Sequence, residues 1–138
     1  MEKADIMVPL FLLQGGRKFE VLRSERIAYG HTWISKADAA GLPGKVACTL
    51  FSGGCNFRCP FCQNGNLVQH PEWEPVIPEE EIFAVLEKRR GVLDGVCVTG
   101  GEPTLDPDLE RFVTKIKELG YLVKLDTNGY RPEILKKL

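Results

Sequence analysis

Three short apolar segments, each followed by a polar motif that contains glycine, constrain the fold of this chain most strongly. They span residues 46–51, 95–99 and 121–125, and each is nearly continuous in apolar side chains. Such runs are typical of strands buried on both faces of a parallel sheet. Helical patterns lie between them over residues 78–91 and 106–120. Because helical crossovers join parallel strands, the sequence predicts an α/β fold with a parallel sheet.

The helices are predicted from their ends as well as from their apolar periodicity. Pro78 opens the first helix, ahead of glutamates that the helix dipole favours. Asp106 caps the second helix and Pro107 takes its first position. A third helix opens at Arg131 and runs on to Leu138. The predicted order of elements is therefore β-α-β-α-β-α.

Polar motifs follow all three predicted strands. Gly53 and Gly54 lead into a cysteine-rich loop, residues 100–103 read Gly-Gly-Glu-Pro, and residues 126–129 read Asp-Thr-Asn-Gly. The carboxyl ends of parallel strands lie at one edge of a sheet, where α/β proteins carry their sites. We therefore expect the three motifs to face one pocket. Gly-Gly and Asn-Gly also serve simply as turns, and that alternative stays open.

Three of the five cysteines, Cys55, Cys59 and Cys62, fall within eight residues. Three thiols so close together on a loop favour a metal site. Structural zinc and electron-transfer clusters normally take four protein ligands, so three thiolates indicate a [4Fe–4S] cluster with one iron open to substrate or cofactor. The alternative is a zinc site in which His70 is the fourth ligand.

Composition limits the class of protein. The 138 residues carry a net charge of −1 and are 43% hydrophobic, which excludes extensive disorder and a basic surface for nucleic acid. No apolar run approaches the roughly 20 residues of a membrane span. The cysteine count is odd and the N-terminus lacks the pattern of a secretion signal, so disulfides are not expected. The sequence predicts a cytoplasmic protein with neither a membrane nor nucleic acid as partner.

The Cys-x₃-Cys-x₂-Cys spacing of residues 55–62 and the Gly-Gly-Glu of residues 100–102 resemble the radical S-adenosylmethionine (radical SAM) superfamily. Residues 43–45 (Pro-Gly-Lys), 54–59 and 126–129 narrow the resemblance to the glycyl-radical-enzyme activating enzymes. The greatest similarity is to the activating proteins of anaerobic ribonucleotide reductase and pyruvate formate-lyase. The cysteine loop ends in Cys-Gln-Asn here, where the family has Cys-His-Asn.

The resemblance implies the cofactors and the reaction. Members of the family hold a [4Fe–4S] cluster on three cysteines, and the amino and carboxylate groups of SAM chelate the fourth iron. One electron cleaves SAM and releases a 5′-deoxyadenosyl radical, which in an activating enzyme abstracts hydrogen from a glycine of a partner glycyl radical enzyme. An electron donor such as flavodoxin or ferredoxin is expected. The implied activity is that of an anaerobic oxidoreductase.

The resemblance also implies a set of site residues. Cys55, Cys59 and Cys62 would hold the cluster, and no catalytic side chain beyond the cluster is expected. Phe61 matches the aromatic position that packs on the adenine of SAM. After the second strand, Gly100, Gly101 and Glu102 match the segment that binds the SAM amino group. After the third strand, Asp126 and Thr127 match positions that ligate a monovalent cation near SAM in some activating enzymes.

The length of the chain is small for the implied fold. The family core is a partial barrel of six βα units, and since eight units take about 250 residues, six need roughly 190. Residues 45–138 supply about three units. We therefore expect a truncated N-terminal half of a partial (β/α)₆ barrel, preceded by a β-rich N-terminal extension, residues 1–44, with a hairpin. The alternatives are another radical SAM enzyme acting on a small molecule or RNA, a zinc-binding module, and an inactive fragment.

Overall fold

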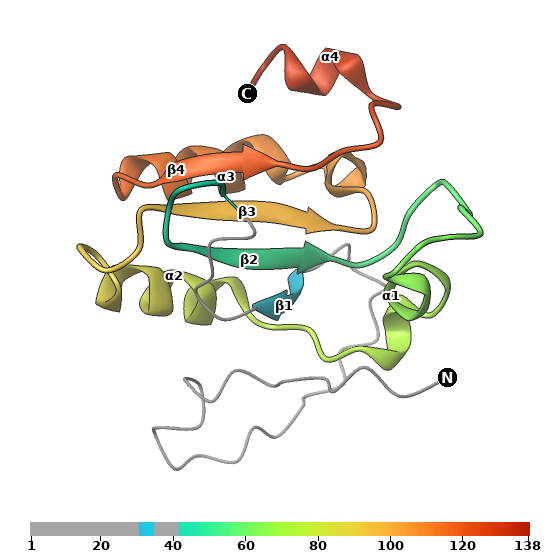
Figure 1. The fold of residues 1–138 in the computed structure, drawn as a ribbon, viewed down its shortest axis with the longest axis horizontal. Coiled ribbons are helices and arrows are strands. Elements are labelled where there is room, and N and C mark those ends of the chain that lie inside the picture. The colour runs from blue at the N-terminus through green and yellow to red at the C-terminus, as the bar shows by residue number, and fades with distance from the viewer. Residues whose placement is uncertain (1–30, 35–41) are drawn as a thin grey trace.

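A four-stranded sheet forms the centre of the computed structural model, which describes residues 31–34 and 42–138 (Figure 1). Its strands lie in the spatial order in which they follow along the chain: β1 (His31–Ile34), β2 (Ala47–Ser52), β3 (Gly95–Gly100) and β4 (Leu122–Leu125). Strands β2, β3 and β4 are parallel. The predicted α/β fold with a parallel sheet is therefore confirmed.

Strand β1 lies beside β2 and runs antiparallel to it, with Trp33 opposite Phe51 and Ile34 opposite Leu50. This strand belongs to the residues predicted as a β-rich extension, so the extension contributes directly to the sheet. The hairpin predicted nearer the N-terminus, over residues 6–22, lies outside the described residues.

Two longer helices connect the parallel strands, α2 (Glu79–Lys88) between β2 and β3 and α3 (Leu109–Glu118) between β3 and β4. Helix α3 begins later than the predicted Pro107, because residues 107 and 108 form a turn. Asp106 holds this turn, since its carboxylate accepts a hydrogen bond from the Asp108 N–H at 2.8 Å. The shorter helical elements are α1 (Gly65–Gln69), η2 (Pro71–Trp73), η3 (Pro103–Leu105) and α4 (Pro132–Leu135). No helix among the described residues is long and apolar enough to cross a membrane.

The hydrophobic core joins helices α2 and α3 to the sheet. Ile82 on α2 and Phe112 and Ile116 on α3 are at most 1% exposed. Phe83 on α2 meets Phe112 edge-on, with 5.5 Å between the ring centroids. The sheet residues of this cluster that are completely buried are Leu50, Val96 and Val98. Since each such side chain contributes about 1.5–3 kcal/mol on burial, this cluster fixes both helices against the strands.

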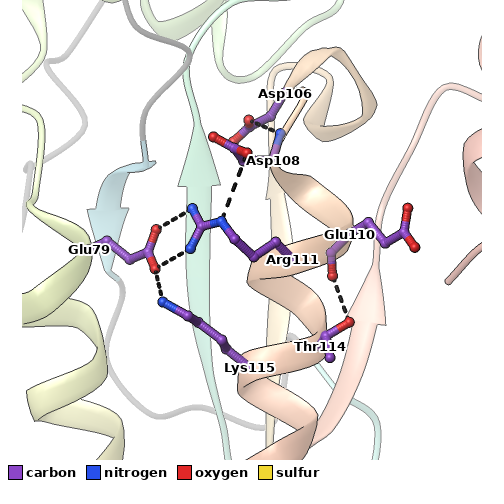
Figure 2. A network of polar contacts seen from close by, with 7 residues as sticks. All are labelled: Glu79, Asp106, Asp108, Glu110, Arg111, Thr114 and Lys115. Carbon is purple, nitrogen blue, oxygen red and sulfur yellow. Dashed lines mark hydrogen bonds and ion pairs between the residues drawn. The ribbon is translucent and has the colours of Figure 1, made fainter.

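A polar network on the surface also joins the two helices (Figure 2). The Glu79 carboxylate, in the first turn of α2, accepts hydrogen bonds from both terminal nitrogens of Arg111 on α3, at 2.7 and 2.8 Å. Lys115, one turn further along α3, donates to the same carboxylate at 2.8 Å. The Arg111 hydrogen bond is the largest cause that lowers the pKa of Glu79 to about 2. The fork geometry makes this pair stronger than an ordinary surface ion pair.

Candidate functional site

The three polar motifs lie at the same edge of the sheet, where β2, β3 and β4 end (Figure 1). Ser52 is paired with Gly100, and the Gly101 N–H donates to the Ser52 carbonyl at 2.9 Å. On the other side of β3, the Asp126 N–H donates to the Val98 carbonyl at 2.9 Å. The motifs therefore meet at one edge of the sheet, because in-register parallel strands bring their carboxyl ends together. The shared pocket that they were expected to face stays a prediction.

The cysteine loop is fastened directly to the end of β3. The Glu102 N–H donates to the Gly54 carbonyl at 2.9 Å. A Cβ on Gly101 would overlap that same carbonyl oxygen, so only glycine fits this position. Gly100 has a φ of +119°, and a Cβ there would collide with the backbone of Ser52. The Gly-Gly pair therefore does more than turn the chain: it permits the close approach of the two segments.

The three predicted ligands, Cys55, Cys59 and Cys62, are free thiols on one loop. Cys62 N–H donates to the Cys59 carbonyl at 3.1 Å, and Phe57 N–H donates to the Cys55 sulfur at 3.3 Å. Across residues 31–34 and 42–138, no three His, Cys, Asp or Glu side chains come together at a separation that would hold a metal ion. The donor set itself, three reduced thiols within one glycine-led loop, fits the chemistry of an iron–sulfur cluster.

His70, the alternative fourth ligand of a zinc site, has other contacts in the structure. Its ring stacks on Trp73 with 3.8 Å between centroids and 9° between planes. Its Nδ1 lies 3.3 Å from a carboxylate oxygen of Glu72. These contacts place His70 between α1 and η2, where it has a local structural role.

Glu102 is almost completely buried, and its carboxylate accepts four hydrogen bonds. Two come from Thr104, through its N–H at 3.1 Å and its hydroxyl at 2.6 Å. Two come from the turn after β4, through the Thr127 hydroxyl and the Asn128 N–H, both at 2.6 Å. Burial raises the pKa of Glu102, but the hydrogen bonds from Asn128, Thr104 and Thr127 outweigh it and hold the pKa below its ordinary value. The carboxylate thus ties the ends of β3 and β4 together.

The two residues predicted to ligate a monovalent cation both have protein partners. Asp126 lies 2.9 Å from the Lys124 ammonium and accepts a hydrogen bond from the Cys97 thiol at 3.4 Å. Burial raises the pKa of Asp126, but its hydrogen bonds with Lys124 and Cys97 outweigh that effect and lower it. Thr127 donates to Glu102 and accepts the Gly129 N–H at 3.1 Å. The Lys124 ammonium already neutralises part of the charge that would attract a cation to Asp126. The cation site therefore stays a prediction.

Aromatic side chains lie exposed around the cysteine loop. Phe61, predicted to pack on adenine, is 83% exposed. Phe57 and Tyr130 meet edge-on with 6.4 Å between their ring centroids, and both are also exposed. Phe61 is therefore free to contact a ligand, whereas Phe57 already packs against the segment after β4.

Two asparagines at the site were not among the predicted site residues. The Asn64 side chain donates to the Gly100 carbonyl at 3.1 Å, which joins the end of the cysteine loop to β3. The Asn128 side chain donates to the Asn56 side-chain oxygen at 3.0 Å and joins the end of β4 to the same loop. Asn64 ends the Cys-Gln-Asn sequence of the cysteine loop and Asn128 lies in the Asp-Thr-Asn-Gly motif, and these positions were the signal available in the sequence.

Sequence comparison identifies the family to which this fold and this cysteine loop belong. The family model of the radical SAM superfamily matches residues 49–138, which is more than half of the chain. The chain belongs to the radical SAM superfamily. Membership implies a [4Fe–4S] cluster and S-adenosylmethionine as cofactors, as the sequence predicted.

Similar proteins with different names cover the same region. A Methanocaldococcus jannaschii protein, provisionally named a glycyl-radical enzyme activating enzyme, is 37% identical over 98 residues, which are 70% of this chain and 39% of that protein. A 7-carboxy-7-deazaguanine synthase of Halobacterium salinarum is 33% identical over 91 residues, 64% of this chain and 34% of the synthase. A Saccharolobus solfataricus protein, provisionally named a GTP 3′,8-cyclase, is 35% identical over 99 residues, 67% of this chain and 30% of that protein. The chain thus spans about a third of the length of these relatives.

Proposed function

We propose that this chain carries the cluster side of the active site of a glycyl-radical-enzyme activating enzyme, with Cys55, Cys59 and Cys62 as the cluster ligands. The observation that supports this most directly is the junction of the cysteine loop with the Gly-Gly-Glu motif, through the Glu102 N–H and the Gly54 carbonyl at 2.9 Å. Bound to these three cysteines, a cluster would supply the electron for reductive cleavage of SAM, and the proposed outcome is removal of a hydrogen atom from a glycine of the partner enzyme.

The protein's own contribution is to bind SAM beside the cysteine loop. Phe61 is exposed beside the cysteines and supplies an apolar face for adenine. The backbone carbonyls at Gly100 and Gly101 are proposed acceptors for the SAM ammonium, since the Glu102 carboxylate already accepts four hydrogen bonds. The Gly100 carbonyl accepts a hydrogen bond from Asn64 and has a second lone pair for the ammonium. Asp126, partly neutralised by Lys124, supplies a negative charge near this edge of the sheet.

A glycyl radical enzyme is the proposed substrate because two relatives, 37% and 34% identical, bear activating-enzyme names. The second candidate is an enzyme acting on a small molecule, which the synthase and cyclase matches favour. In either case a flavodoxin or ferredoxin would supply the electron. We place the reaction in a reducing compartment such as the cytoplasm, where exposed thiols stay reduced. A chain spanning 39% of the first relative is proposed to carry part of that protein's activity rather than all of it.

Anaerobic reconstitution with iron and sulfide tests the cluster assignment. The wild-type chain should bind about four irons and four sulfides, the content of one cubane cluster. A Cys59→Ala variant should lose this cluster, whereas the control Cys48→Ala, which changes a buried cysteine inside β2, should retain it. A colourless chain with one zinc, lost in a His70→Ala variant, would refute the assignment.

The choice between partners needs an isotope experiment on SAM cleavage. With a glycyl radical enzyme deuterated at its glycine α-carbons, deuterium should appear in 5′-deoxyadenosine. Deuterium that instead enters from a labelled nucleotide, with none from the protein, would favour the small-molecule alternative.

A further inference from the structure

Asn128 connects the turn after β4 to the cysteine loop. Its side-chain nitrogen lies 3.0 Å from the Asn56 side-chain oxygen and 3.9 Å from the Cys55 sulfur. Its side-chain oxygen accepts the Tyr130 N–H at 2.9 Å. Because an amide has one acceptor end and one donor end, the Tyr130 contact fixes the NH₂ group on the side of the cysteine loop.

A buried carboxylate holds Asn128 in this position. The Asn128 N–H donates to Glu102 at 2.6 Å, and the Thr127 hydroxyl beside it donates to the same carboxylate at 2.6 Å. Glu102 is only 1% exposed. Charge-assisted hydrogen bonds to a buried acceptor are among the stronger ones in proteins. These hydrogen bonds to Glu102 therefore hold the part of the turn from which the Asn128 side chain reaches the cysteine loop.

The Cys55 sulfur is a weak acceptor as a thiol and a stronger one as the thiolate that binds iron. It already accepts the Phe57 N–H at 3.3 Å, and the Asn128 amide is a second donor directed at the same atom. Hydrogen bonds to the ligand sulfurs of an iron–sulfur cluster draw off negative charge and are one of the factors that set its reduction potential.

We propose that Asn128 is a positioning residue for Cys55 that donates an N–H to its sulfur and thereby raises the reduction potential of the cluster. This inference rests on the proposed function, because it requires that Cys55 ligate the cluster. The Gly-Gly-Glu motif and the Asp-Thr-Asn-Gly motif then act as one unit, in which Glu102 sets the place of Asn128.

The test is a potentiometric titration of the reconstituted chain, with the reduced cluster followed by EPR. In Asn128→Ala, the ratio of reduced to oxidised cluster at a fixed potential should fall roughly tenfold, which is about 59 mV for a one-electron couple. Asn128→Asp should lower it further, because a carboxylate replaces the donor. Asn66→Asp is the matched control, since it makes the same change of charge at an exposed position on α1 and should leave the potential unchanged.

Iron content and far-UV circular dichroism, measured on the same samples, separate the outcomes. Variants that bind wild-type amounts of iron at an unchanged potential would overturn the inference and leave the proposed function standing. Variants that bind less iron than the wild type, while the cluster that remains keeps the wild-type potential, would show a purely structural role for Asn128 and would also overturn the inference. A wild-type chain that binds no cluster would overturn the proposed function, and the inference with it.

Discussion

Replacing Glu79 by glutamine should lower the free energy of unfolding, and the lowered pKa of the Glu79 carboxyl sets an upper bound on the loss. The carboxyl pKa falls from 4.5 to about 2 in the folded chain. At about 1.4 kcal/mol for each tenfold change in the equilibrium, this difference corresponds to roughly 3.5 kcal/mol as an upper bound. Arg111 and Lys115 are each 47% exposed, so solvent screens the pair. The expected loss in Glu79→Gln is therefore about 1–1.5 kcal/mol at pH 7.

The sign of the pH dependence follows from the lowered pKa. A carboxylate with a depressed pKa stabilises the fold above its unfolded value of 4.5, and this contribution disappears as the pH falls towards about 2. Wild-type stability should therefore decrease more steeply than that of Glu79→Gln between pH 5 and pH 2. The free energies of unfolding of the two chains should converge near pH 2 and below, where residue 79 becomes uncharged in both.

Urea titrations followed by far-UV circular dichroism at pH 7 and pH 3 give the stability loss at neutral pH and its change with pH. The control is Glu80→Gln, which removes the same charge from the next residue of α2, an exposed side chain with no ion pair among the described residues. Equal losses in the two variants at pH 7, within about 0.5 kcal/mol, would refute the reasoning, since the loss would then come from net charge alone.

Three further changes test the core and the site by the same titration. Gly101→Ala should lower the free energy of unfolding by breaking the junction of the cysteine loop with β3, because its Cβ would overlap the Gly54 oxygen. The control Gly65→Ala places its Cβ 3.9 Å from its nearest side-chain contact and should change the free energy of unfolding by less than about 1 kcal/mol. Glu102→Ala should cost about 3–5 kcal/mol, since it leaves several buried donors without an acceptor. Phe112→Ala should cost about 3–5 kcal/mol through the cavity it creates in the core, and a loss below about 1 kcal/mol would contradict the assigned packing.

The parallel sheet could be predicted from sequence because its determinants are local. Each apolar run, such as that around Val96 and Val98, is long enough to identify a buried strand without knowledge of its neighbours. Residues 31–34 were not singled out as a strand within the predicted β-rich extension, because so short a segment shows no clear periodic pattern and its pairing with β2 is seen only in the fold. The start of α3 was placed too early for a related reason: Asp106 stabilises a turn before the helix, and a cap and a turn use the same side chain.

The site could be predicted only as far as its motifs are continuous in sequence. The Gly-Gly-Glu motif identified Gly101 as a site residue, but its close approach to the Gly54 carbonyl required the fold. The inward orientation of Glu102 could not be foreseen, since two of its donors, Thr127 and Asn128, lie about 25 residues further along the chain. Their approach depends on the register of β3 with β4, which no local pattern encodes.

The central claim is that the loop holding Cys55, Cys59 and Cys62 binds a cluster with one iron open to SAM. Electron–nuclear double resonance on the reduced, reconstituted chain measures this directly, with SAM labelled by ¹⁵N at its amino group. We expect a nitrogen coupling to the cluster that changes with the label and is absent from Cys59→Ala. A chain whose cluster gives the same spectrum with and without SAM would contradict it.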